Sequence, residues 1–427
     1  MAAIPLIEET SASRSGVMIG HLAGFEQLET PPHLTEAMEA RRPVRGLAIY
    51  PASAGFEMVE ELDHLAARTV EPNVFFNPRF LAPAMPRLED KEVRLAVMRD
   101  GDDFRSRLRL LAPFTLERPT LPLGVPVMRS WSNIFGPLGT PLLDRDDPSG
   151  VLEDFFAMLA RPHLKLPRVF VFPEIRLDGA FAGILRLVAG NNNLPLTVTN
   201  EYDRSHLVSR LDGEAYMRAT QNSHRRGEFR RLHRRLQEQG ELVYEVARTP
   251  EEIRAAMEAF LALEASGWKG RERTAMAVDR FQAAFAREAI DRLAEVDMCR
   301  IHALRLNGKV IASLVVFVEA GIAYTWKTAF DEAFSPYSPG TLLMIDVTKS
   351  HLEDPNIEMT DSCAAPNHPL VGRLWGETRR IGTMVVGLTP ASERATRQVG
   401  QQLHLYRETR NVLRDVRNRV RNLARRR

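Results

Sequence analysis

Hydrophobic and polar residues alternate most clearly in the segment that begins at Met298. Residues 298–306 and 310–319 are apolar and partly alternating, and Asn307-Gly308 between them is a strong signal for a tight turn between antiparallel strands. Residues 322–329 follow after Ala320-Gly321 and have the same character. The pattern predicts three consecutive strands that form a meander.

A loop containing Ser338, Pro339, Gly340 and Thr341 follows the third strand and leads into a helix. The pattern then predicts a strand near Ile357, a short helix and a last strand that ends near Leu388. The first N–H groups of a helix have no partner within the helix and favour an anion, and glycine permits close approach. An ordinary capped helix after a Pro-Gly turn is the alternative.

A similar order of elements is predicted upstream. We expect a loosely ordered arm over residues 1–42, a first α/β domain over 43–205, a second over 206–390 and a basic amphipathic helix over 391–427. A long helix is expected over residues 213–239 and another after Pro250, where an N1 proline precedes acidic residues. The stretch 113–141 is rich in proline and fits either a groove or a loop.

Composition indicates an ordinary soluble protein of two or three domains, with 427 residues, 44% hydrophobic and 26% charged. Only Cys299 and Cys363 are present, which suits a reducing cytosol and predicts no disulfide framework. Neither a signal peptide nor a membrane-spanning run is evident. We therefore expect a cytoplasmic protein.

The charge is unevenly distributed. The net charge is +2, but residues 397–427 contain ten arginines and two acids, so this tail carries +8 and the rest of the chain −6. Apolar residues recur in the tail at helical spacing, which predicts weak peripheral contact with an anionic membrane at its cytoplasmic face. Docking of the tail on the acidic body is the competing interpretation.

The second half resembles the acetyltransferase domain of the CelD type, from cellulose and exopolysaccharide biosynthesis, which is similar in fold to the Fem peptidyltransferases. The resemblance covers about residues 221–387. It is carried by Arg230-Arg231-Leu232 with Arg235-Leu236, Glu264 with Gly267-Trp268-Lys269-Gly270, His302-Ala303-Leu304 with Gly308-Lys309-Val310-Ile311-Ala312, Ser338-Pro339-Gly340-Thr341-Leu342-Leu343, and Asp361.

The resemblance implies an α/β (α+β) protein of two tandem GNAT-like domains with mixed sheets flanked by helices, the first domain degenerate. It implies acyl transfer from acetyl-CoA, without a metal, to an amino group of a sugar or polysaccharide precursor bound between the domains. Ser338, Gly340, Thr341 and Leu342 would bind the donor's phosphates. The loop is shorter than in standard acetyltransferases, so an acyl carrier protein or an aminoacyl-tRNA is an alternative donor. A non-catalytic scaffold of a polysaccharide-synthesis machine is a further alternative.

Proton removal from the amine requires a group that titrates near neutrality or a chain of waters. The candidates are Asp361, Glu264, Tyr324 and His368, for which a surface histidine is the ordinary alternative. Asp361 is ranked first because it ends the predicted fifth strand, where strands four and five would separate. Capping of the following loop by its carboxylate is the alternative. Glu264 either binds the acceptor or pairs with Lys269.

Aromatic and cationic residues are the candidates for acceptor binding, namely Trp268, Lys269, Trp326 and Lys327. Strand alternation predicts that Tyr324 and Trp326 face one side and Lys327 the other.

Arg230 and Arg234 lie in an arginine-rich predicted helix and fit contact with phosphate groups. A solvated helix face is the ordinary alternative. RNA binding would apply only to a tRNA-dependent enzyme.

Overall fold

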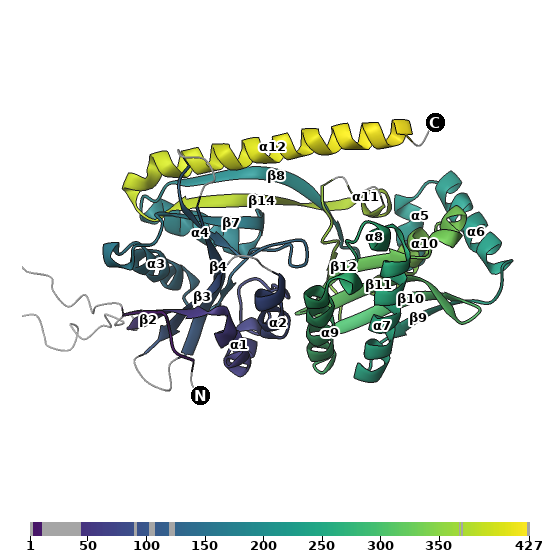
Figure 1. The fold of residues 1–427 in the computed structure, drawn as a ribbon, viewed down its shortest axis with the longest axis horizontal. Helices are drawn as coiled ribbons and strands as arrows, with labels where there is room; N and C mark the ends of the chain where they lie inside the picture. The colour runs from purple at the N-terminus through teal and green to yellow at the C-terminus, as the bar shows by residue number, and fades with distance from the viewer. Residues whose placement is uncertain are drawn as a thin grey trace, which may run out of the picture.

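Two α/β halves share one continuous sheet in the computed structural model, and a long C-terminal helix runs along it (Figure 1). The structure describes residues 3–10, 44–88, 92–101, 107–118, 124–366, 368 and 370–424, with side chains as far as Arg410. The predicted α/β fold class, with a mixed sheet flanked by helices, is confirmed.

The first half contains strands β1 (Ile7–Thr10), β2 (Arg45–Pro51), β3 (Val93–Asp100), β4 (Arg107–Glu117), β5 (Val127–Ser130), β6 (Leu142–Leu143), β7 (Val169–Arg176) and β8 (Leu196–Leu207). Its helices are α1 (Val59–Ala66), α2 (Pro78–Leu88), α3 (Pro148–Leu159) and α4 (Ala180–Asn191). Helix α2 was not predicted, because Pro83 and Pro86 lie inside it and normally argue against a helix.

The second half contains strands β9 (Leu242–Ala247), β10 (Cys299–Leu306), β11 (Lys309–Glu319), β12 (Ile322–Phe330), β13 (Met359–Asp361) and β14 (Glu377–Gly387). Its helices are α5 (Gly213–Thr220), α6 (Ser223–Gln237), α7 (Pro250–Ser266), α8 (Trp268–Arg271), α9 (Arg280–Ala294), α10 (Pro339–Glu353) and α11 (Val371–Leu374). The single helix expected over residues 213–239 is two helices, because Asn222 caps a new helix with its side chain.

The last strands of the two halves join the sheet. Strands β8 and β14 pair antiparallel from Leu196↔Val386 to His206↔Glu377. Strand β14 also pairs with β7, while the end of β8 pairs with β13. The boundary expected near residue 205 therefore does not separate two independent sheets, since the last strand of the second half lies within the sheet of the first.

One hydrophobic core extends across both halves. Phe75 and Phe80 of the first half make edge-to-face contacts with Phe317, Phe285 and Trp326 of the second. All five residues belong to one buried cluster. Because aromatic pairs add to the stability gained from burial, this core holds the halves together at the sheet face covered by α7 and α9.

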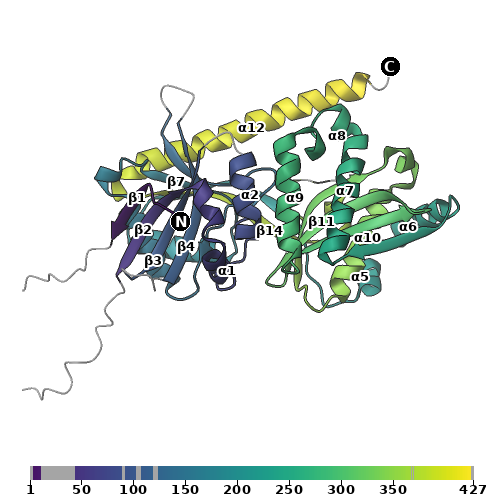
Figure 2. The same ribbon diagram turned by 60° about the horizontal axis from the view of Figure 1, so that its bottom comes forward.

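Helix α12 (Glu393–Ala424) packs against β8 and β14 through its first part, as Figures 1 and 2 show. Val399 is buried among valines of the sheet, and Asn200 donates a hydrogen bond to the Leu403 carbonyl. These contacts come from residues before Arg410, and the docking predicted for the tail over residues 410–427 stays a prediction. The side chains of residues 411–427, which carry most of the predicted basic face, lie outside the described residues.

The N-terminal arm differs from expectation where it is described. Residues 7–10 form β1, an edge strand paired with β2. Residues 11–42 of the predicted arm lie outside the described residues. Within the described part of the chain, none of the helices has the length and apolar character needed to span a bilayer.

Candidate functional site

Strands β12 and β13 separate at the centre of the second half. They pair in parallel only from Ile322↔Met359 to Tyr324↔Asp361. Beyond this point the Thr325 hydroxyl donates to the Ser362 carbonyl, at 2.8 Å. Among the described residues, β12 then continues to Phe330 without a strand neighbour on that side. Apart from the Thr328 carbonyl, which accepts from Lys269, its main-chain groups there are candidates for contact with a ligand.

A bulge in β12 changes which side chains share a face. Val315 pairs with Lys327 and Val316 pairs with Thr325, so Trp326 is the extra residue. The predicted opposition of Trp326 and Lys327 is therefore wrong, because a bulge breaks the alternation of side chains. Both side chains reach the same loop of the first half, which is residues 133–136.

This first-half loop lies against the end of β12. The Trp326 indole donates to the Phe135 carbonyl at 2.7 Å, and the Lys327 amine donates to the Ile134 carbonyl at 3.1 Å. The Asn133 side chain accepts from two N–H groups within the loop and fixes its turn. The sequence left open whether this proline-rich stretch lines a groove or fills a loop. In the structure, residues 133–136 form one wall of the candidate site.

Helix α10 begins beside the separated strands. Ser338 has a left-handed backbone, with φ 52° and ψ 53°, and Pro339 follows as the first helical residue. The Ser338 side chain does not cap the helix, although its carbonyl accepts from Thr341 and Leu342. The Gly340 N–H donates to none of the described residues and lies at the helix end that favours anions.

Helix α3 holds the matching position in the first half and begins in the same way, but a side chain already occupies its N-terminal end. Asp147 before α3 also has a left-handed backbone, with φ 51° and ψ 48°, and Pro148 follows. Its carboxylate accepts from the Gly150 N–H at 3.2 Å and is held by Arg45 at 2.6 Å. A protein carboxylate thus occupies the anion position at α3. Each of the two helices begins at a proline that follows a polar residue, in Asp147-Pro148 and Ser338-Pro339. These two pairs were visible in the sequence and could have indicated the repeat.

Glu264 and Lys269 form an ion pair at the same end of β12. The Lys269 amine lies 2.7 Å from one Glu264 oxygen, and the Met276 N–H donates to the other at 2.9 Å. Lys269 also donates to the Thr328 carbonyl. The predicted pairing of Glu264 with Lys269 is confirmed. The buried carboxylate holds the α8 segment against the strand.

Lys327 lies beside this pair. Burial, and next the positive charge of Lys269, lower the pKa of the Lys327 amine to about 8. The amine is 4.3 Å from the centre of the Phe135 ring. Within the described ranges, no carboxylate approaches the Lys327 amine closely enough to form an ion pair.

Asp361 is completely buried at the junction of the halves instead of facing an open cleft. One carboxylate oxygen is 3.4 Å from Arg176, 3.8 Å from Arg204 and 3.3 Å from the His206 ring. The other oxygen accepts from the Cys363 N–H at 2.8 Å, so the loop-capping alternative is present. Burial alone would raise the pKa of Asp361, but His206 and the two arginines outweigh it and hold the pKa well below its usual range.

Tyr324 lies in the same buried junction. Its hydroxyl donates to the Pro72 carbonyl at 3.1 Å, and burial raises its pKa. Neither Tyr324 nor Asp361 is accessible to an acceptor in this structure.

The arginine-rich helix α6 borders the start of α10. The Arg235 guanidinium lies 5.3 Å from the centre of the Tyr337 ring. Tyr337 directly precedes Ser338 in the chain. Arg231 is one turn away on the same side of the helix. Arg230 and Arg234, the two arginines named from the sequence, are exposed on other sides of the helix.

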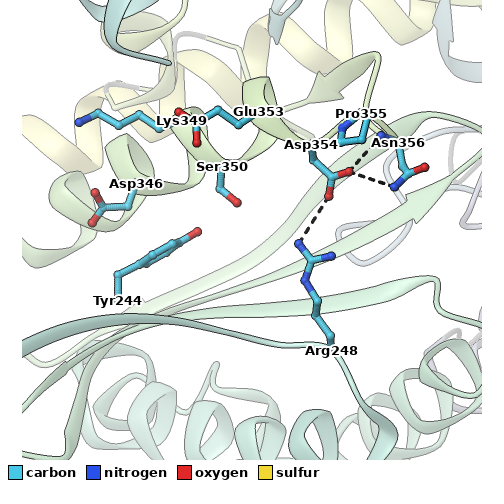
Figure 3. A pocket seen from close by; sticks show the side chains of 9 residues that line it. All are labelled: Tyr244, Arg248, Asp346, Lys349, Ser350, Glu353, Asp354, Pro355 and Asn356. Carbon is cyan, nitrogen blue, oxygen red and sulfur yellow. Dashed lines mark hydrogen bonds and ion pairs between the residues drawn. The ribbon is translucent and has the colours of Figure 1, made fainter. Parts of the chain in front are cut away.

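A surface hollow lies away from this opening, at the other end of α10 (Figure 3). Its volume is about 590 Å³, and an Arg248–Asp354 ion pair crosses it at 3.5 Å. Its lining runs from Asp346 to Asn356 along the chain and includes Tyr244. At about 1.5 Å per residue, α10 separates Glu353 from Ser338 by roughly 22 Å. We therefore place the donor site at the separated strands and not in this hollow.

Comparison with known proteins agrees with this geometry. Residues 223–366 match the family described as the acetyltransferase (GNAT) domain. No curated protein sequence matches the chain. Among solved structures, FemX is 10% identical with a TM-score of 0.50, covering 79% of this chain and 98% of its own. The C-terminal domain of an assigned lysylphosphatidylglycerol synthetase from Agrobacterium fabrum is 13% identical with a TM-score of 0.50, covering 84% and 97%. These likenesses concern the fold alone, and residues 223–366 match the GNAT acetyltransferase domain.

Proposed function

We propose that the second half binds an acyl thioester, most simply acetyl-CoA, and transfers its acyl group to an amine. The observation that carries this proposal is the open start of α10 beside the separated strands. Phosphates would bind the Gly340 N–H and the first turn of the helix, where the dipole favours an anion. The closed start of α3 supports a donor site in the second half alone.

Other groups fit the remaining needs of the reaction. Arg235 and Arg231 flank the phosphate position. Main-chain N–H groups of β12 beyond the bulge would stabilise the oxyanion that forms on the thioester carbonyl. Because Asp361 and Tyr324 are buried and Glu264 is held by two donors, we assign proton removal to water at the opening.

The proposed acceptor is an amino group on a sugar or polysaccharide precursor, as the CelD resemblance implies. It would bind between the loop 133–136 and α8. Trp268 is 46% exposed there and offers an aromatic face, with Lys269 and Lys327 nearby. Trp326 is 8% exposed and packs on Phe135, so it supports this wall from behind.

A Fem-like enzyme that takes its acyl group from aminoacyl-tRNA is the second candidate. The exposed arginines of α6 favour it, because a row of guanidinium groups suits a polyphosphate backbone. Within α6, only Glu228 opposes these charges.

Calorimetric titration of the full chain separates the candidates. Micromolar binding of acetyl-CoA, followed by release of free CoA when an amine is added, supports the first. Retention of aminoacyl-tRNA at moderate salt without binding of acetyl-CoA supports the second. If the chain binds neither donor but sediments with vesicles, it is a scaffold and the catalytic proposal fails.

A further inference from the structure

We infer that the acceptor carries an oxyacid group, a phosphate or a carboxylate, beside the amine that is acylated, and that Lys327 binds this group with help from Lys269. The inference rests on the proposed acyltransferase function. It adds a class of acceptor that the fold does not specify.

The first argument is that the Lys327 amine makes fewer hydrogen bonds than it has donors. An ammonium group has three donors, and within the described residues the Lys327 amine makes one hydrogen bond, to the Ile134 carbonyl. Its side chain is half-buried between the two halves. Placing a cation in such a position without an anion is costly, so the site favours a ligand that brings one.

The second argument is the local charge. Glu264 is the nearby carboxylate, but Lys269 and the Met276 N–H already occupy its two oxygens. The three charged groups, Glu264, Lys269 and Lys327, therefore sum to one positive charge. An incoming oxyacid would neutralise that charge without displacing the ion pair.

The third argument is the position of the amine relative to the reacting atoms. Lys327 directly follows the bulge of β12, whose free main-chain groups face the donor's thioester in our proposal. An anion on Lys327 would therefore orient an amine a few bonds away toward the thioester carbonyl. Such positioning by a charged contact lowers the entropic cost of reaction.

The apolar walls are consistent with a bound organic acceptor instead of a free ion. Ile134 is 74% exposed, Phe281 50% and Trp268 46%. Phe281 lies one turn before Phe285 on α9, and Phe285 packs against Phe135. Ile134 bears the carbonyl that Lys327 contacts, Phe281 lies on α9, and Trp268 directly precedes Lys269 on α8.

The ordinary alternative is that Lys327 merely ties the two halves together through the Ile134 carbonyl. The two readings differ in which acceptors react. With acetyl-CoA as donor, release of CoA is measured for glucosamine, glucosamine 6-phosphate and muramic acid. We expect one or both of the anionic amines to be preferred over glucosamine. Comparing glucosamine 6-phosphate with muramic acid shows whether the site prefers a phosphate or a carboxylate.

Lys327→Met should raise the KM of the preferred anionic amine about 10- to 100-fold, and that of glucosamine much less, since a charged hydrogen bond to the oxyacid is lost. Lys327→Arg should retain part of the preference. The matched control is Lys165→Met, an exposed lysine of the first half. The affinity for acetyl-CoA, measured in parallel, should be equal in all variants.

A second measurement tests the inference even if the Lys327→Met variant unfolds or none of the three amines is an acceptor. Trace labelling of the wild-type chain with acetic anhydride reports the reactivity of each lysine by mass spectrometry. Inorganic phosphate or acetate, at constant ionic strength, should protect Lys327 several-fold more than Lys165. Equal protection overturns the inference.

The outcomes separate the two proposals. A chain that does not bind acetyl-CoA refutes the proposed donor, and this inference falls with it. A chain that binds acetyl-CoA but acylates glucosamine as well as its anionic analogues, or whose Lys327→Met variant keeps the preference, refutes this inference alone.

Discussion

The Asp361 carboxylate of the second half lies 3.4 Å from the Arg176 guanidinium of the first, and both side chains are almost completely buried. A buried ion pair is weak evidence for net stability, but removing one partner leaves an uncompensated charge. The contact therefore makes Asp361 a structural member of the junction, whatever its part in catalysis.

Asp361→Asn should lower the free energy of unfolding by about 3–5 kcal/mol, because Arg176, Arg204 and His206 lose their shared anion. Urea denaturation measures the change. The matched control is Asp178→Asn, because the exposed Asp178 carboxylate is 4.0 Å from Arg379. This change should lower the free energy of unfolding by less than about 1 kcal/mol. A variant of unchanged stability with strongly reduced kcat would instead support Asp361 as the base.

Gly340→Asp should weaken acetyl-CoA binding about 100-fold, because a carboxylate at the start of α10 repels phosphate and competes for the same N–H groups. A Cβ on Gly340 meets only Phe330, at 3.6 Å, so the change should not unfold the domain. Gly340→Ala is the control and should bind the donor nearly normally. Calorimetry measures both affinities, and equal values for the two variants would remove the proposed phosphate site.

Glu264→Gln should raise the KM of the acceptor and leave the pH dependence of kcat unchanged. The amide can still accept from the Met276 N–H, but it loses the charge that holds Lys269. Steady-state kinetics between pH 6 and 9 test this expectation. If kcat falls about 100-fold or more and the limb of the profile at low pH disappears, Glu264 is the base.

Acid should destabilise the chain through two buried histidines. His302 on β10 and His351 on α10 are buried and neutral, and burial lowers the pKa of His351 to about 4 and that of His302 well below its usual value. The unfolded chain takes up these protons near pH 6.5, so stability is lost as the pH falls from about 6.5 toward 4.

At pH 5 the cost for His351 alone is about 2 kcal/mol. His351→Gln removes this titration, so the loss of stability between pH 7 and 5 should be smaller than in the wild type, as measured by urea denaturation. An equal loss in both proteins would show that His351 takes up its proton without cost in the folded state.

Truncation after Arg410 should leave the melting temperature within about 2 °C of the full chain, because the contacts of α12 that the structure describes with the body are made by residues before that point. Truncation after Ser392 removes buried Val399 and should destabilise.

The segment after Arg410 holds seven arginines, and we propose that it makes weak contact with anionic membranes at the cytoplasmic face. Cosedimentation with vesicles containing phosphatidylglycerol should therefore decrease on truncation after Arg410 and disappear at high salt. Equal sedimentation with and without the segment would contradict this role.

The sequence by itself determined the local elements of the second half. The turn at Asn307-Gly308, the strands around it and the start of a helix at Pro339 depend on short-range preferences, so they were predictable. The pairing of Glu264 with Lys269 was also predictable, because the residues lie five apart at a helix end. The same local signals supported the fold class.

Only the tertiary structure decided which residues meet at the site. The bulge at Trp326 reversed the predicted side of Lys327, and it depends on the pairing register of β11 and β12. The burial of Asp361 depends on Arg176 and Arg204, which precede it by more than 150 residues and reach it because β8 and β14 join the two half-sheets. Contacts between residues so distant in the chain are set by strand order and packing, which local propensity does not encode.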